Sequence, residues 1–181
     1  FISERYAPLL EEIRPSLQAV EHVYTLDFKA TDLPTYQELR EHGIDEPLFA
    51  DVDDDAASLI IYTSGTTALP KGVVLTHQTL SAYVLNTQNP ADPAGEHAIT
   101  LVSVPFFHIA GATTMIGSLF SGRTLTILPQ FDPSAWLATV ERERATHAFV
   151  VPTMLNRVME VDDFDSYDVS SLQLITYGAA P

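Results

Sequence analysis

The sequence contains no cysteine. This absence excludes a disulfide framework, a thiolate metal site and a cysteine nucleophile from the chemistry of the chain. A chain without disulfides suits a reducing compartment, so we expect a cytoplasmic location. A serine nucleophile of the hydrolase type is disfavoured as well, because no Gly-x-Ser-x-Gly segment occurs in the sequence.

Basic residues are scarce. The chain has 9 Lys plus Arg against 24 Asp plus Glu, which gives a formal net charge of -15 at pH 7. A surface with this charge repels the phosphate backbone of nucleic acids and the head groups of anionic lipids. We therefore expect no nucleic-acid partner.

Residues 98–122 lack Asp, Glu, Lys and Arg, and this run is long enough to resemble a membrane span. Pro105 and His108 interrupt the run, and Gly111 and Gly117 weaken a continuous helix. We therefore expect no transmembrane segment here, but a buried strand, a turn and a helix. The first six residues have neither an initiator Met nor an apolar core of a signal peptide, so the chain is expected to start inside a longer protein.

Predicted strands and helices alternate along the chain. Short apolar runs predict strands, and apolar residues at three- and four-residue spacing predict helices. Strands are expected at residues 23–26, 58–62, 73–76, 99–104, 124–128, 148–151 and 172–177. Helices are expected at residues 6–17, from Thr31–Asp32 onward, through Leu80 to Val84, and at residues 109–120, 133–146 and 153–160. The alternation indicates an α/β fold with a mostly parallel sheet flanked by helices.

Two helix starts are specified by their capping residues. Thr76 is a predicted N-cap, and Asp132 followed by Pro133 supplies both an N-cap and a proline at the first helical position. The helix after Pro133 is expected to place three apolar side chains on one face: Trp136, Leu137 and Val140.

Few residues suggest a metal site. An acidic run at residues 51–55 could be a calcium loop, but it lacks the glycine and the distal glutamate of that pattern, so a solvated loop is expected. The six histidines show no spacing typical of a metal site, and a capping or core role is the simpler interpretation for each.

The most informative segment is Tyr62 to Val73, with the sequence YTSGTTALPKGV. Its hydroxyl and amide groups and its single cation, Lys71, are the groups that bind a polyphosphate. The spacing differs from that of a P-loop NTPase, because Pro70 precedes the lysine and Gly72 follows it. On residue types alone, a plain surface loop between two strands remains open.

The order of residues in this segment resembles the phosphate-binding loop of the adenylate-forming superfamily. That superfamily comprises acyl-CoA synthetases, aryl-CoA ligases, luciferases and the adenylation domains of peptide synthetases. The resemblance implies that Thr63, Ser64, Gly65, Thr66 and Thr67 wrap the phosphates of ATP. It further implies that Thr66 helps to hold Mg²⁺ and that Lys71 meets the leaving phosphates. The family usually has glycine where this chain has Ala68.

Two further segments resemble the same superfamily. Pro105 to Gly111, with the sequence PFFHIAG, is similar to its aromatic and histidine motif, which implies that His108 lies near the substrate carboxylate and the adenylate. The end of the chain is similar to the segment where small residues let adenine and the acyl group approach the backbone. Its residues are Gly178, Ala179, Ala180 and Pro181.

The resemblance covers nearly the whole chain and implies that residues 1–181 are part of the large N-terminal AMP-binding domain, without the C-terminal domain. It implies an acyl-CoA synthetase acting on a fatty acid, with ATP, Mg²⁺ and CoA as cofactor and substrates. Since later motifs of the family cannot be found before Pro181, we expect the isolated chain to be inactive. Two alternatives stay open, a ligase that loads a carrier protein and a non-catalytic nucleotide-binding fragment. The sequence also leaves open a homo-oligomer.

Overall fold

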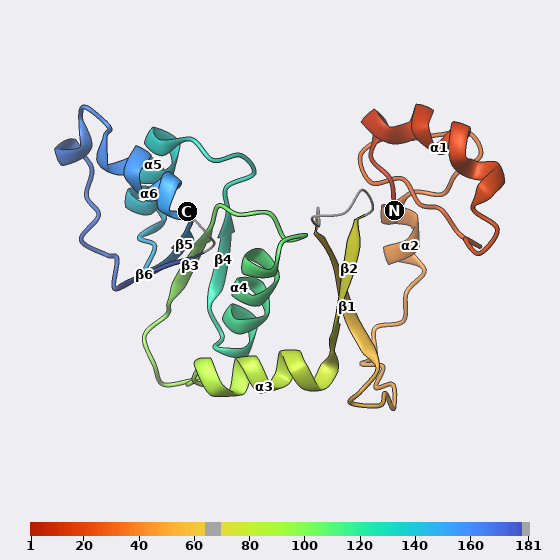
Figure 1. Cartoon of the computed structure of the whole chain (residues 1–181), viewed down its shortest axis with the longest axis horizontal. Coiled ribbons are helices and arrows are strands. Elements are labelled where there is room, and N and C mark those ends of the chain that lie inside the picture. The colour runs from red at the N-terminus through yellow and green to blue at the C-terminus, as the bar shows by residue number, and fades with distance from the viewer. Residues whose placement is uncertain (64–69, 179–181) are drawn as a thin grey trace. The chain divides into compact units, whose positions relative to one another are not determined.

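The computed structural model of the protein describes residues 1–63 and 70–178 (Figure 1). The chain divides into two compact units, Phe1–Asp51 and Val52–Pro181. Each unit is described by itself.

The first unit is built from short helices. Helix α1 (Ala7–Ile13) lies between 3₁₀ helices at Glu4–Tyr6 and Arg14–Ser16, and α2 spans Tyr36–Glu41. The helix predicted at 6–17 is therefore α-helical only up to Ile13, because Pro15 has no backbone N–H to continue the ladder.

Two predictions for this unit were wrong. Residues 23–26 form no strand, and only Thr25 makes isolated bridges, to Ile2 and Thr35. The second helix does not start at Thr31–Asp32, because Thr35 is its N-cap. Thr35 and Glu38 form a capping box, in which the Glu38 amide donates to Thr35 Oγ1 at 3.1 Å and the Thr35 amide donates to Glu38 Oε2 at 2.7 Å.

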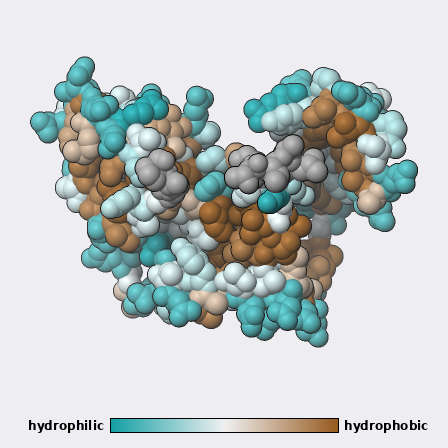
Figure 2. Space-filling model, viewed as in Figure 1, coloured by the Kyte–Doolittle hydropathy of each residue, from teal (hydrophilic) through white to brown (hydrophobic). Residues whose placement is uncertain are grey.

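The second unit begins with an antiparallel hairpin of β1 (Ala57–Thr63) and β2 (Lys71–Thr76). This hairpin is a two-stranded sheet of its own, separate from the parallel sheet. The hairpin exposes three apolar side chains: Ile60, Val73 and Val74. Figure 2 shows a hydrophobic surface in the region of the hairpin.

The predicted parallel sheet follows. Strands β3 (Ile99–Val102), β4 (Thr124–Ile127), β5 (His147–Val150) and β6 (Leu174–Tyr177) lie in the order β4-β3-β5-β6. Every neighbouring pair is parallel, with Leu101 opposite Ala148 in the central pair. The carboxyl ends of the four strands therefore lie at one edge of the sheet.

Four α-helices accompany this sheet: α3 (His77–Thr87), α4 (Ile109–Phe120), α5 (Pro133–Glu143) and α6 (Pro152–Met159). Helices α4 and α5 contact the sheet, α3 packs on α4, and α6 packs on α5. A 3₁₀ helix at Phe164–Ser166 follows α6. Both predicted caps are confirmed, because Thr76 accepts the Thr79 amide and Asp132 accepts the Ala135 amide at 2.8 Å. Helix α5 ends three residues earlier than predicted, since Arg144 has a left-handed backbone with φ 54°.

The core lies between the sheet and α5 with α6. Trp136, Leu137 and Val140 of α5 are buried as predicted. They pack with Leu101 of β3 and with Ala148 and Val150 of β5. Side chains alternate between the two faces of a strand, so the neighbouring residues of β3 and β5 face the other side, where α4 lies (Figure 1).

The uncharged run at residues 98–122 forms β3, a turn and α4, as the sequence predicts. Within residues 1–63 and 70–178, no helix is long and apolar enough to cross a bilayer.

Candidate functional site

The parallel sheet brings two of the sequence motifs to one edge. His108 follows the end of β3, and Gly178 directly follows β6. Since the carboxyl ends of parallel strands meet at the same edge, two motifs far apart in sequence become neighbours. Ligands of open α/β sheets bind at this edge.

His108 and Gly178 line one apolar cavity of about 340 Å³. Helices α3 and α4 supply most of its wall, and Phe149 of β5 and Leu75 of β2 complete it. Such a cavity can hold the apolar body of a small ligand, with His108 as its only ionisable imidazole among the residues that the structure describes there.

The imidazole of His108 has a fixed orientation. His108 is the N-cap of α4, and its Nδ1 accepts the Ala110 amide at 3.3 Å. In the neutral ring this assigns the proton to Nε2, which can donate a hydrogen bond. His108 therefore combines a capping role, which the sequence allowed, with an Nε2 donor that has no partner among residues 1–63 and 70–178.

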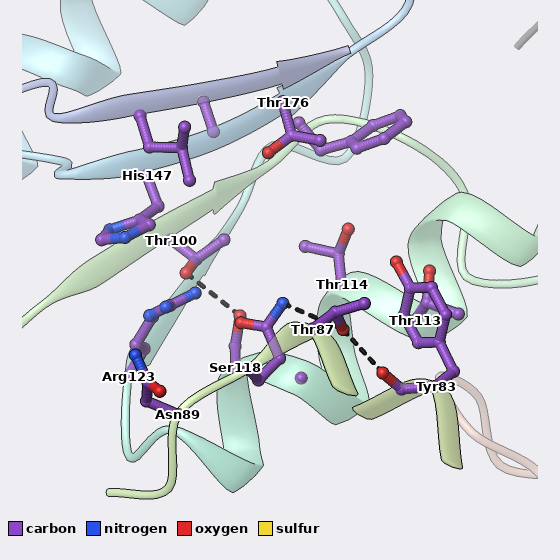
Figure 3. Close-up of a pocket in the computed structure, with 15 residues that line it drawn as sticks. Tyr83, Thr87, Asn89, Thr100, Thr113, Thr114, Ser118, Arg123, His147 and Thr176 are labelled. Atoms are coloured by element: carbon purple, nitrogen blue, oxygen red, sulfur yellow. Dashed lines mark hydrogen bonds between the residues drawn. The ribbon is translucent and has the colours of Figure 1, made fainter. Parts of the chain in front are cut away.

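A second cavity of about 290 Å³ lies next to the first and is polar. The two share Tyr83, Thr113 and Phe149. Its own wall carries polar groups from α4, β3, β5, β6 and the residue before β4 (Figure 3): Thr100, Ser118, Arg123, His147 and Thr176. Ser118 Oγ donates to Thr100 Oγ1 at 3.0 Å, and both residues are buried.

Arg123 and His147 set the charge of the polar cavity. Burial lowers the pKa of the Arg123 guanidinium, which still stays protonated at neutral pH. Burial also lowers the pKa of His147, and the charge of Arg123 lowers it further. We therefore expect a neutral imidazole beside a guanidinium at pH 7, so that the cavity has a net positive charge.

The alternation of residues along β3 and β5 contains a signal for this cavity. Thr100 and His147 are polar residues at inward positions of apolar strands, opposite each other in the β3–β5 register. Ser118 and Arg123 gave no such signal, because their position depends on how α4 crosses the sheet.

The predicted phosphate-binding segment is described only at its two ends. Thr63 ends β1 and Lys71 begins β2, and the two residues are paired in the antiparallel register. Directly opposite residues point to the same face of a hairpin, so both exposed side chains share one side. Neither lines the apolar cavity.

Several predicted site residues lie outside the described residues: Ser64, Gly65, Thr66, Thr67, Ala179, Ala180 and Pro181. Within the described ranges, no group of three or more His, Asp or Glu side chains is arranged to hold a metal ion. The acidic run at 51–55 is exposed there, and Asp53 Oδ1 accepts the Asp55 amide at 3.0 Å.

Comparison with known proteins identifies the family. Residues 2–181 match the sequence profile of the AMP-binding enzymes. The chain belongs to the AMP-binding enzyme family. Its fold, a parallel sheet flanked by helices, is that of the N-terminal domains of the adenylate-forming superfamily, as the resemblance of its motifs implied.

Two relatives and one solved structure illustrate the similarity. A feruloyl-CoA synthase of Amycolatopsis sp is 38% identical over 138 residues, which cover 76% of this chain and 28% of the relative. The long-chain-fatty-acid–CoA ligase FadD13 of Mycobacterium tuberculosis is 33% identical over 175 residues, which cover 97% of this chain and 34% of the relative. The crystal structure of the N-terminal domain of FACL13 from the same species superposes with a TM-score of 0.73 at 29% identity. The match covers 99% of this chain and 44% of that structure. The chain spans between about a quarter and a third of the length of these curated relatives.

Proposed function

We propose that residues 1–181 are part of the N-terminal domain of an adenylate-forming ligase, which activates a carboxylic acid with ATP and transfers the acyl group to coenzyme A. The observation that carries the proposal is the meeting of His108 and Gly178 at one apolar cavity. Both belong to motifs that resemble the superfamily, and the family match over residues 2–181 supports the same assignment.

The reaction has two steps. A carboxylate oxygen attacks the α-phosphorus of ATP, and the bond between the α-phosphorus and the bridging oxygen breaks, which releases pyrophosphate. The sulfur of the CoA thiol then attacks the acyl carbon, the bond to AMP breaks, and the thiol proton leaves to solvent. Catalysis of this kind depends on positioning and on charge stabilisation rather than on a protein nucleophile.

In this proposal His108 acts at the carboxylate. Its Nδ1 is occupied by the Ala110 amide, so the Nε2–H is the donor that remains for an oxygen of the substrate or adenylate. The acyl group would lie in the apolar cavity, with Gly178 at its wall. The resemblance of the motif assigns Ala179, Ala180 and Pro181 to the contact with adenine and the acyl group.

The hydroxyl-rich segment would hold the phosphates of ATP. Its ends, Thr63 and Lys71, are exposed and lie on one face of the hairpin, which suits a shared anionic ligand. Lys71 would neutralise the leaving phosphates, and Ser64, Gly65 and Thr67 would donate hydrogen bonds to them. Thr66 would contribute a ligand to Mg²⁺, which would neutralise phosphate charge when bound.

The proposed substrate is a carboxylic acid in general, a wider class than the fatty acid that the sequence resemblance implied. The relatives include a feruloyl-CoA synthase and a long-chain-fatty-acid–CoA ligase at similar identity, 38% and 33%. An aryl acid and a fatty acid are both compatible with an apolar cavity of about 340 Å³.

The test is carboxylate-dependent exchange of labelled pyrophosphate into ATP, measured on the full-length protein with a panel of aryl and alkyl acids. We expect Lys71→Met to lower the exchange rate by about a hundredfold or more, since it removes one cation from the transition state. The matched control is Lys29→Met, which changes the other lysine of the chain and should leave the rate unchanged. His108→Ala should lower exchange as well, and His22→Ala should not.

The outcomes separate the alternatives. Exchange with no acid in the panel would contradict the ligase assignment. Tight ATP binding without exchange would favour a non-catalytic nucleotide-binding protein. Exchange without CoA acylation would favour transfer to a carrier protein. The isolated 181-residue chain is expected to show no exchange.

A further inference from the structure

The polar cavity has no role in the proposed function as stated. It adjoins the apolar cavity through Tyr83, Thr113 and Phe149, which line both. Figure 3 shows Tyr83 and Thr113 at one end of the polar cavity and Arg123 with His147 at the other. A ligand that fills the apolar cavity and extends past the shared residues would therefore reach the cationic end.

The guanidinium of Arg123 is without a partner in the described part of the chain. Every ion pair found within residues 1–63 and 70–178 involves another arginine: Arg14, Arg142 or Arg144. The only hydrogen bond described for Arg123 uses its backbone amide, which donates to Ser118 O at 2.8 Å. A half-buried cation without an acceptor favours a ligand that supplies one.

The backbone fixes Arg123 at this end. Helix α4 finishes at Phe120, Gly122 takes a left-handed conformation with φ 65°, and the Arg123 amide returns to the last turn of the helix. This is the C-terminal capping arrangement that ends a helix with glycine. It directs the chain into β4 and leaves the Arg123 side chain on the wall of the cavity.

Strand β5 sets the distance between the cationic end of the polar cavity and the residues that line both cavities. Phe149 and His147 lie two residues apart on one face of β5, which corresponds to about 7 Å. Polar groups continue along this path, because Thr100 of β3 is opposite His147 and Thr176 of β6 is opposite Phe149. An alkyl chain end at this place would bury the Arg123 guanidinium without supplying an acceptor.

We propose that the acid activated by this protein carries an oxygen acceptor, a phenolic oxygen or a second carboxylate, at the end far from the reacting carboxyl group, and that Arg123 binds it. This inference rests on the proposed function, because it assigns the acid of the same site. Arg123 is a specificity-determining residue in this proposal and takes no part in the chemical steps.

The test compares two matched pairs of acids on the full-length protein. Octanedioate is compared with octanoate, and 4-hydroxycinnamate with cinnamate, by kcat/KM for pyrophosphate exchange. We expect the oxygen-bearing acid of at least one pair to be preferred by about tenfold or more, since a charged hydrogen bond is made only to that member. Preference in the dicarboxylate pair alone identifies a carboxylate end, and preference in the phenol pair alone identifies a phenol end.

Substitutions then assign the preference to Arg123. Arg123→Met should raise KM for the preferred acid about tenfold with little change in kcat, because the lost contact is far from the reacting atoms. The same substitution should leave KM for the unsubstituted acid nearly unchanged. Arg123→Lys keeps a cation and should restore part of the preference. Arg142→Met is the control, since Arg142 pairs with Glu143 and does not line the cavity.

Preference for the unsubstituted acid in both pairs, or no preference, overturns the inference while the ligase assignment stands. An equal loss for both members of a pair in Arg123→Met overturns it too. Calorimetric titration of wild type with the same acids gives a reading without ATP. If exchange is absent with every acid, the ligase assignment fails, and the calorimetric preference still decides whether the cavity selects an oxygen-bearing end.

Discussion

Gly111, in the first turn of α4, lies directly against the carbonyl oxygen of Pro105. The same oxygen accepts the backbone amide of His108 at 3.1 Å. A Cβ at position 111 would come closer than 3.0 Å to this oxygen, a separation that Cβ atoms essentially never show. The tight turn that presents His108 at the apolar cavity therefore requires glycine three residues later.

Gly111→Ala is expected to destabilise the protein by roughly 1–3 kcal/mol, because the backbone turn must move to admit the methyl group. Alanine has a higher helix propensity than glycine by about 1 kcal/mol, and this gain offsets only part of the loss. Urea unfolding followed by circular dichroism measures the change.

Gly117→Ala, in the same helix, is the matched control. Its Cβ would meet only the flexible side chain of Gln88, at 3.1 Å, so this variant should be close to neutral. Equal destabilisation by the two substitutions would show that the Pro105 contact has no special weight.

Local capping signals made parts of the fold predictable. Asp132 with Pro133 and Thr76 each specify a helix start through a hydrogen bond to a residue three positions later, and both predictions are confirmed. The first unit was predicted poorly for a related reason. The capping box of Thr35 and Glu38 is an equally local signal, but Thr31–Asp32 before Pro34 was read in its place.

The site was predictable only where a motif marked it. His108 and Gly178 were named from motifs, and parallel strand order then explains their meeting at one cavity. The polar cavity was not predicted, because the Ser118–Thr100 hydrogen bond joins a helix to a strand across the sheet and leaves no periodic pattern. Arg123 depends in the same way on where α4 ends.

Asp132→Ala is expected to destabilise the protein by about 1 kcal/mol, since the Ala135 amide loses its acceptor at the start of α5. Helix α5 contributes Trp136, Leu137 and Val140 to the core, so the loss should appear in global unfolding. Chemical denaturation measures it. Asp132→Asn keeps a side-chain oxygen at the cap and should recover most of the stability, whereas an equal loss in both variants would contradict a capping role.

Asp168 should titrate well below its ordinary range. Hydrogen bonds from the side chain and amide of Ser170, and then from Arg144, lower its pKa from 3.8 to about 2. Arg144 Nη1 lies 2.6 Å from Asp168 Oδ2. Because the folded pKa is below the unfolded one, the carboxylate stabilises the fold above about pH 4, and this contribution is lost as the pH falls through about 2.

Carboxyl ¹³C NMR of the chain measures this titration. Ser170→Ala removes the hydroxyl donor and keeps the amide donor, and Arg144→Met removes the guanidinium. Each should raise the pKa of Asp168 part of the way towards its ordinary value, because each removed group lowers it. Ser81→Ala, at an exposed position of α3, should leave the titration unchanged. A wild-type midpoint near 3.8 would contradict the described hydrogen bonds.

The Ser118–Thr100 hydrogen bond should stabilise the floor of the polar cavity. Both side chains are nearly inaccessible, with exposed fractions of 2% and 3%. Ser118→Ala would leave the Thr100 hydroxyl without its partner, and an unsatisfied buried hydroxyl costs about 1–3 kcal/mol. Urea unfolding measures this loss, and Ser81→Ala, an exposed helical serine, should change stability by no more than about 0.5 kcal/mol.

The double variant Ser118→Ala with Thr100→Val separates two causes of the stability loss. One is the broken hydrogen bond, and the other is the small void that alanine leaves in place of serine. Valine has the shape of threonine without its hydroxyl, so the double variant contains no unsatisfied group and should recover part of the stability lost in Ser118→Ala. The two positions are in contact, and their effects are therefore expected to be non-additive. If the losses simply add, the two hydroxyls do not depend on each other.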